Sequence, residues 1–306
     1  MIKIKIAVDA GHGSNTAGKR TPSMPRNIDF NNDGKIDVSK GMSIREHIAN
    51  VGVAICLVEE LERCGFDVIK TGIDDSHAYD DDNITLTKRQ QVIKSAECDY
   101  SVSIHFNAFG DGKSFNSAQG IEVLIHDRYQ KDSEALAMKV LKHIVQGTLQ
   151  KNRGVKEQAL AMCNCNAMNT KASILIECAF MTNLNEAVSM MGNEDYWKET
   201  AIEIAKGICD YTKTTYLPEA KKEAESIVTI YHRVQVGAFR HKLKGDALVE
   251  RVKEAGFKDA FAKTTFLDGL PLYRVQIGAY AKRANAEITL AKVKAAGFTD
   301  AFISIY

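Results

Sequence analysis

The chain has 306 residues, which is enough for two domains. Its apolar fraction of 45% and charged fraction of 26% are those of an ordinary globular protein, and they exclude the fibrous and disordered classes. No run of about 18 apolar residues occurs and the formal net charge is +1, so we expect neither a membrane span nor a nucleic-acid partner.

The chain enters strand-like sequence at once. Residues 2–8 read IKIKIAV and leave no room for the apolar segment and cleavage site of a signal peptide. We therefore expect the protein to be made in the cytoplasm without a signal peptide. Any work outside that compartment then requires another route of release.

Residues 1–216 alternate between strand-like and helix-like patterns, which indicates one domain. The apolar, strand-like runs are 2–8, 66–71, 100–105, 120–126 and 173–178. The helix-like runs are 43–63, 85–96, 130–149 and 193–213. Strands and helices in alternation, with apolar strands, predict an α/β fold whose mainly parallel sheet carries helices on both faces.

Three of the predicted strands end in side chains that can bind a metal ion. The first ends in the glycine-flanked His12, the second in His105 and the third in Glu177. The carboxyl ends of parallel strands meet at one edge of a sheet, where open α/β folds place their sites. We therefore expect these three side chains to converge.

Two carboxylates compete for the third position of such a metal site. Catalytic zinc typically has three protein ligands and an open fourth position, so His12 and His105 need one carboxylate. Glu46 begins a predicted helix, and the run from Ser43 to Glu46 is also a capping box, which predicts a structural glutamate at the third helical position. Glu177 lies among apolar residues, where burial raises the pKa of a carboxyl group and suits it to general-base catalysis. The residues alone leave both roles open.

A series of motifs runs through this first domain. They are VDAGHG at 8–13, Glu46 followed by Asn50, Arg89 ahead of SIHFNA at 103–108, GIEV at 120–123, RGV at 153–155 and ILIECAFMTN at 174–183. With these motifs, residues 4–213 resemble the zinc-dependent N-acetylmuramoyl-L-alanine amidases of the Amidase_3 family, which cleave bacterial peptidoglycan. The resemblance implies that His12, Glu46 and His105 bind zinc and that Glu177 is the catalytic residue. The implied reaction is metal-assisted hydrolysis of an amide bond.

The loop at 27–40 departs from the usual length of that family. Its oxygen-bearing side chains have the spacing of an EF-hand calcium loop, with a glycine at the sixth position. They are Asp29, Asn31, Asp33 and Asp37. Lys40 stands where such a loop has a bidentate glutamate, so the alternative is a turn in a solvated loop.

Residues 217–229 are charged and have no hydrophobic face, which indicates a linker. Beyond it, residues 230–306 contain a repeat with a period of 41 residues: RVQVGAF at 233–239 recurs as RVQIGAY at 274–280, and KEAGFKDAF at 253–261 recurs as KAAGFTDAF at 294–302. Two copies of one β-α-β unit predict a small α+β domain, a ferredoxin-like βαββαβ layer with helices on one face. Its thirteen basic and seven acidic residues favour a polyanionic or polar polymer as partner.

The repeated halves of residues 230–306 resemble the SPOR domain, which implies binding to peptidoglycan and particularly to denuded glycan. We predict that Gln235 and Gln276 bind the hydroxyl groups of the glycan, with plain strand packing as the alternative. In the first domain, Asn107 is a candidate for orienting the substrate, with polar loop packing as its alternative. The expected partner is bacterial peptidoglycan, both the amidated glycan strands that carry peptides and the denuded ones.

The stretch TAGKRTP at 16–22 additionally resembles phage endolysins of the same family. The leading hypothesis is therefore an endolysin for host lysis, made in the host cytoplasm and released to the wall through a holin-like export partner. The alternatives are a host amidase of sporulation or mother-cell lysis, a zinc peptidase on a similar sheet, and a non-catalytic wall-binding protein.

Overall fold

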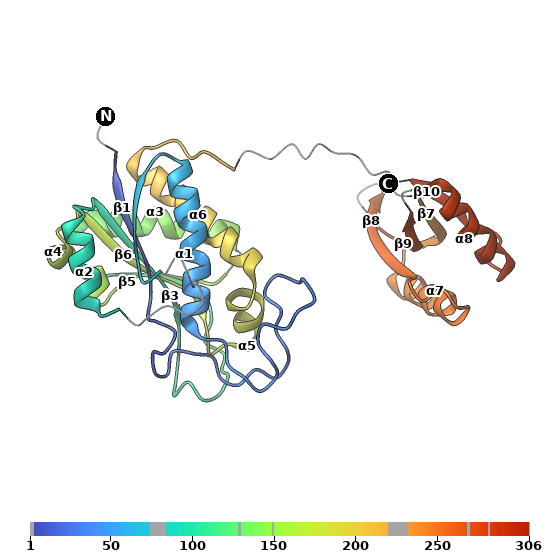
Figure 1. The fold of residues 1–306 in the computed structure, drawn as a ribbon, viewed down its shortest axis with the longest axis horizontal. Coiled ribbons are helices and arrows are strands. Elements are labelled where there is room, and N and C mark those ends of the chain that lie inside the picture. Colours follow the sequence, from blue (N-terminus) through green and yellow to red (C-terminus); the bar gives the residue numbers. More distant parts are fainter. Residues whose placement is uncertain are drawn as a thin grey trace. The chain divides into compact units, whose positions relative to one another are not determined.

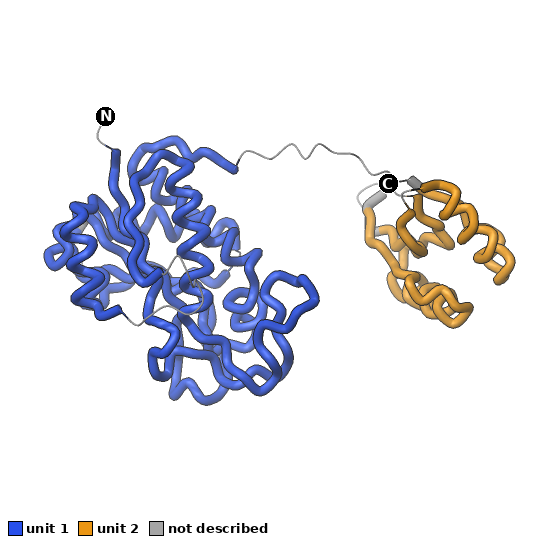
Figure 2. Tube along the Cα trace, viewed as in Figure 1, with its two compact units in different colours: residues 1–219 blue, residues 220–306 orange. Residues whose placement is uncertain are grey.

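The computed structural model describes residues 3–73, 84–127, 130–148, 150–219, 232–267, 270–280 and 282–305. The chain divides into two compact units, Met1–Glu219 and Ala220–Tyr306 (Figure 2). The division lies inside the segment predicted as a linker, although 220–229 of that segment falls outside the described residues. Among the helices of the described part, none combines the length and the apolarity that crossing a membrane requires.

The first unit is built on a six-stranded sheet with the order β2-β1-β3-β6-β4-β5 (Figure 1). The neighbouring strands β2, β1, β3 and β6 run parallel, whereas β4 is antiparallel to β6 and parallel to β5. The bounds are Lys5–Ala10 for β1, Asp67–Thr71 for β2, Tyr100–Asn107 for β3, Ile121–Ile125 for β4, Asn152–Glu157 for β5 and Ala172–Phe180 for β6. The mainly parallel sheet predicted from the sequence is confirmed.

Helices cover both faces of this sheet. On one face lie α1 (Glu46–Arg63), α3 (Lys131–Gly147) and α6 (Glu194–Thr212); α6 packs against both α1 and α3, and the core beneath them includes Ile6 and Val8. On the other face, α2 (Leu86–Ser95), the short helix α4 (Cys165–Met168) and the 3₁₀ turn η1 (Ala161–Cys163) pack together around Ala7. Alternate residues of β1 therefore enter two different cores, as expected for a strand buried on both faces.

Several elements of the first unit were not predicted. They are β5, η1, α4, the single turn α5 (Leu184–Glu186) and the π-helical turn η2 (Ala187–Met191). Strand β5 reads NRGVKE and forms the edge of the sheet, so it lacks the apolar run by which the other strands were recognised.

The second unit is a four-stranded antiparallel sheet with two helices, in the order β10-β7-β9-β8. Its elements are β7 (His232–Phe239), α7 (Lys242–Glu254), β8 (Phe261–Leu267), β9 (Leu270–Tyr280), α8 (Arg283–Ala295) and β10 (Phe302–Ile305). The core between sheet and helices contains Val234, Val275 and Ile277 of the strands with Val252 and Val293 of the helices. The predicted βαββαβ layer is confirmed.

Candidate metal centre

A tight corner at the end of β1 brings His12 next to β3. The Gly11 amide donates to the carbonyl of Ile104 at 3.0 Å, and His12 itself has a left-handed φ of +66°. A Cβ atom on Gly11 would overlap the ring of His105. Only glycine therefore allows the corner to lie directly against the imidazole of the neighbouring strand.

Glu46 occupies the first position of α1, not the third. The residue before the helix is Arg45, whose side chain makes no capping hydrogen bond, so the predicted capping box is wrong. The Glu46 amide donates to the carbonyl of Lys19 at 3.0 Å, which attaches the start of α1 to the preceding loop. The carboxylate is free of a capping role and faces the two histidines.

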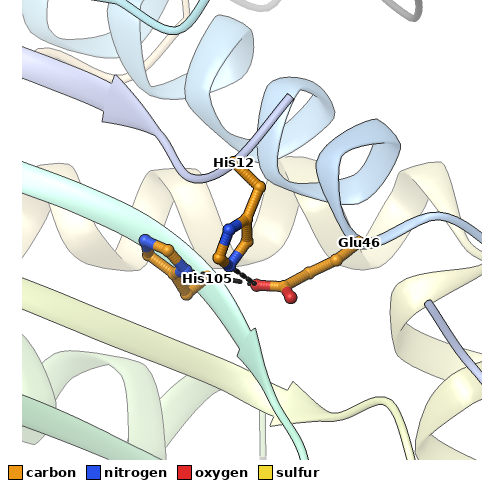
Figure 3. A group of neighbouring side chains, drawn as sticks. All are labelled: His12, Glu46 and His105. Carbon is orange, nitrogen blue, oxygen red and sulfur yellow. Dashed lines mark hydrogen bonds and ion pairs between the residues drawn. The ribbon is translucent and has the colours of Figure 1, made fainter. Parts of the chain in front are cut away.

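His12, Glu46 and His105 form a compact cluster (Figure 3). Glu46 Oε1 lies 3.2 Å from His105 Nδ1 and 3.3 Å from His12 Nε2. The two imidazole rings meet edge to face, with their centroids 4.8 Å apart. One ligand atom from each residue lies within 4.8 Å of the others.

Electrostatics keep Glu46 ionised in this cluster. Burial opposes the charged form, but the hydrogen bonds and charges of His105 and His12 outweigh burial and hold the pKa of Glu46 well below its usual range. Burial lowers the pKa of His12, whereas the hydrogen bond to Glu46 overcomes burial at His105 and raises its pKa. An ionised carboxylate beside two imidazoles is a donor set that zinc accepts.

The cluster also contains a polar atom that no described protein group satisfies. Glu46 Oε2 is buried and has no hydrogen-bond partner among the described residues. His12 Nε2 is also buried, and its contact with Glu46 Oε1 is long, at 3.3 Å. Buried polar atoms of this kind are costly unless they meet a partner. A cation held by these residues would meet that requirement, so the donor set fits a metal ion.

Glu177 lies beside this cluster on β6. It pairs in register with His105 of β3 on one side and with Glu122 of β4 on the other. Its Oε2 atom is buried without a hydrogen-bond partner among the described residues, and burial raises the pKa of Glu177 to about 7. His12, His105 and Glu177 line one cavity of about 380 Å³.

Asn107 lines the same cavity but is already engaged. Its Nδ2 atom donates to Glu122 Oε1 at 2.8 Å, and Glu122 Oε2 accepts from Arg153 Nε at 2.6 Å and from Lys156 Nζ. These hydrogen bonds outweigh burial and lower the pKa of Glu122. Asn107 thus belongs to a charged network next to Glu177, and the polar packing considered from the sequence is present.

Arg89 of α2 holds the corner from the opposite face of the sheet. Its guanidinium is 1% exposed, pairs with Asp9 Oδ1 at 2.7 Å and donates to the backbone carbonyls of Ala10 and His12. Asp9 also accepts from the hydroxyls of Thr71 and Ser103. The sequence marked Arg89 as part of a motif but carried no sign of this role, because its partners are Asp9, about 80 positions away, and two main-chain carbonyls.

The predicted calcium site is not supported. Asp29 accepts from the amides of Asp33 and Gly34, and Asn31 also accepts from Asp33. Asp33 accepts from Lys35, and Asp37 accepts from the amide of Phe30. Within the described residues, the three aspartates do not gather into a metal-binding group. Their oxygens instead cap the amides of their own loop, which is the turn considered as the alternative.

The second unit carries a row of four side chains across its sheet, which we call the glutamine row: Phe302, Gln235, Gln276 and Phe261. Successive members pair in register on adjacent strands, on the face opposite to that of Val234 and Ile277. Both glutamines are buried, whereas Phe302 and Phe261 are 50% and 40% exposed. Among the described residues, the Gln276 amide has no hydrogen-bond partner.

Only the glutamines of this row were predicted. The two phenylalanines end the second pair of repeated segments and stand 41 residues apart, as the glutamines do. The repeat therefore contained the signal that relates Phe261 to Phe302, but only the strand register places them beside the glutamines.

Two family models match the chain. The model described as N-acetylmuramoyl-L-alanine amidase matches residues 6–210, and the SPOR domain model matches residues 229–304. An uncharacterised cell wall amidase of Bacillus anthracis is 31% identical over 135 residues, which are 42% of this chain and 24% of that protein. The chain thus spans about a quarter of the length of the curated relative it matches.

Solved structures resemble the first unit. An N-acetylmuramoyl-L-alanine amidase from Clostridium difficile 630 has a TM-score of 0.53 at 26% identity, covering 69% of this chain and 97% of the other. The catalytic domain of CwlV from Bacillus (Paenibacillus) polymyxa var. colistinus has a TM-score of 0.51 at 21% identity, covering 69% and 99%. The second likeness concerns the fold alone.

Proposed function

The chain belongs to the N-acetylmuramoyl-L-alanine amidase family, and on this premise we propose that it hydrolyses the amide bond between N-acetylmuramic acid and L-alanine in bacterial peptidoglycan. The observation that carries the proposal is the cluster of His12, Glu46 and His105, whose two histidines share one cavity with Glu177. Likeness to the amidase of Clostridium difficile 630 supports the same activity.

We assign His12, Glu46 and His105 as the zinc ligands. The proximity of their ligand atoms and the unsatisfied Oε2 atom of Glu46 support the assignment. Zinc, when bound there, supplies a Lewis acid for the lactyl carbonyl of the muramoyl group. The Arg89 guanidinium donates to the His12 carbonyl and so keeps this proposed ligand in position.

Glu177 is assigned as the general base. A pKa near 7 suits a carboxylate that must both accept and release a proton at neutral pH. Glu177 accepts one proton from the attacking water, and the oxygen of that water bonds to the carbonyl carbon of the lactyl group. Glu177 then delivers that proton to the nitrogen of L-alanine as the carbon–nitrogen bond breaks, so that a muramic acid carboxyl and a free peptide amine result.

The second unit would bind the glycan that this reaction leaves behind. In the glutamine row, exposed aromatic rings flank two amides, a combination that suits sugar rings with their hydroxyl groups. The proposed partner is therefore peptidoglycan for both units. The SPOR match supports peptidoglycan binding by the second unit, and within that unit we assign the contact to Gln235 and Gln276.

As the biological role we propose host lysis by an endolysin, supported by the likeness of residues 16–22 to phage members of the family. This role requires a holin-like partner that admits the protein to the wall. Expression in a susceptible bacterium should cause lysis only when a pore-forming holin is co-expressed. Lysis confined to sporulating mother cells would favour the host-amidase alternative.

The activity is tested by digesting purified peptidoglycan and analysing the products. We expect new L-alanine amino termini, no new reducing sugar ends, loss of activity on chelation and recovery with added zinc. Glu177→Gln should retain zinc but lose at least about a hundredfold in kcat, the usual contribution of a general base, whereas His12→Ala should lose the metal as well. Full activity of the metal-free protein would refute the mechanism.

A further inference from the structure

One basic residue lines the cavity beside the metal centre. Among the lining residues, Lys19 is the only lysine or arginine, and it shares the cavity with His12 and Glu177. Its carbonyl accepts from the amide of Glu46, so its backbone is attached to the helix start that carries a proposed ligand. This main-chain hydrogen bond between Glu46 and Lys19 holds the lysine next to the candidate metal centre.

The positive charge of Lys19 reaches the reacting groups. Lys19 lines the same cavity as His12 and Glu177, so its positive charge lies at the proposed reaction site. Within the described ranges, no carboxylate forms an ion pair with its ammonium group. Glu122, which also lines the cavity, is instead paired with Arg153 and Lys156. As far as the described residues go, the Lys19 ammonium group is thus left for an anionic group of a ligand.

The proposed substrate contains such a group close to the bond that is cleaved. The stem peptide continues from L-alanine to D-glutamate, whose α-carboxylate is the nearest anion to the scissile amide, and bacterial walls differ in whether this carboxylate is amidated. We propose that Lys19 is a specificity residue that binds this α-carboxylate, so that the enzyme prefers stems with D-glutamate over stems with D-isoglutamine. The inference rests on the amidase function proposed above.

Two soluble tetrasaccharide peptides test the inference. Both carry L-alanyl-D-glutamate blocked as a γ-methylamide, and they differ only in whether the α-carboxyl is free or amidated. For the wild-type chain we expect a kcat/KM about tenfold higher for the free acid, the size of one charge-assisted hydrogen bond. In Lys19→Met the ratio should fall to about one, chiefly through the KM of the acid.

Two further variants complete the experiment. Lys19→Arg should retain the preference for the free acid. Lys35→Met removes one positive charge from an exposed side chain outside the cavity, and should leave the ratio near that of the wild type. Equal hydrolysis of both substrates by the wild-type chain, or equal losses on both in Lys19→Met, would overturn the inference alone. Failure of the wild-type chain to cleave either would overturn the amidase function and the inference with it.

Discussion

At the scale of single residues, Gly11 decides whether the metal centre can form. The His105 ring fills the space that a side chain at position 11 would take. His47 and Asn50 of α1 also bind the Gly11 carbonyl, at 2.8 and 2.9 Å. The sequence marked His12 as a candidate metal ligand, but the reason for the glycine before it lies in the neighbouring strand.

Gly11→Ala is expected to destabilise the protein by about 1–3 kcal/mol, because a methyl group enters a fully packed site. It should also weaken zinc binding, since the His105 ring must move. Chemical unfolding and competition with a chromophoric chelator measure the two effects. In a His105→Ala background the ring is gone, so the same substitution should cost distinctly less. Equal costs in both backgrounds would show that the overlap is not the cause.

At the scale of elements, the strands that carry the candidate site were predicted from the sequence. The contacts that hold its side chains in position, such as those of Arg89, were not. The apolar runs of β1, β3 and β6 end in His12, His105 and Glu177, and the three strands are adjacent and parallel as expected. Strand β5 escaped prediction because an edge strand needs no apolar run. These differences arise because the spacing of apolar residues indicates which positions are buried, but not which residues they contact.

The roles of the two glutamates could not be separated by residue pattern alone. The spacing from Ser43 to Glu46 matched a capping box, but the helix begins three residues later than position 43 because the Glu46 amide is bound by the Lys19 carbonyl. That contact spans 27 positions of the sequence and leaves no local signal. The family resemblance supplied the division of roles, and the side-chain contacts of Glu46 now support it.

Helix α2 stabilises the chain segment from Asp9 to His12 through the side chain of Arg89. Substitution of Arg89 tests this contact. Arg89→Met leaves Asp9 buried without its cationic partner and is expected to cost about 3–5 kcal/mol of unfolding free energy. Lys88→Met removes a charge from an exposed neighbour on the same helix and should change stability by about 0.5 kcal/mol or less. Similar losses in both variants, measured by urea unfolding, would contradict a special role of Arg89.

At the scale of the whole molecule, the proposed function has two units with separate hydrophobic cores act on one polymer. Within the described residues, the apolar cluster of the first unit and that of the second share no residue. Six more basic than acidic residues lie in 230–306, whereas 1–229 has an excess of five acidic ones. If the second unit binds the wall as proposed, it raises the effective concentration of the bond that the first unit is proposed to cleave.

Binding and cleavage should therefore respond to different substitutions. Phe302→Ala and Phe261→Ala remove exposed rings of the glutamine row, which lie outside the core of the second unit. In the double variant we expect affinity for denuded glycan to fall about tenfold or more, which corresponds to about 1.4 kcal/mol. Hydrolysis of soluble fragments should persist, because the reacting groups belong to the first unit.

Leu243 offers the matched control for this prediction. It is 83% exposed on α7 and is no member of the glutamine row, so Leu243→Ala removes a comparable apolar group from a helix of the same unit. Co-sedimentation with denuded glycan and with intact peptidoglycan should be unchanged in this variant. If Leu243→Ala weakens binding as much as the two phenylalanine substitutions do, retention arises from general apolar adhesion and the glutamine row is not the glycan-binding surface.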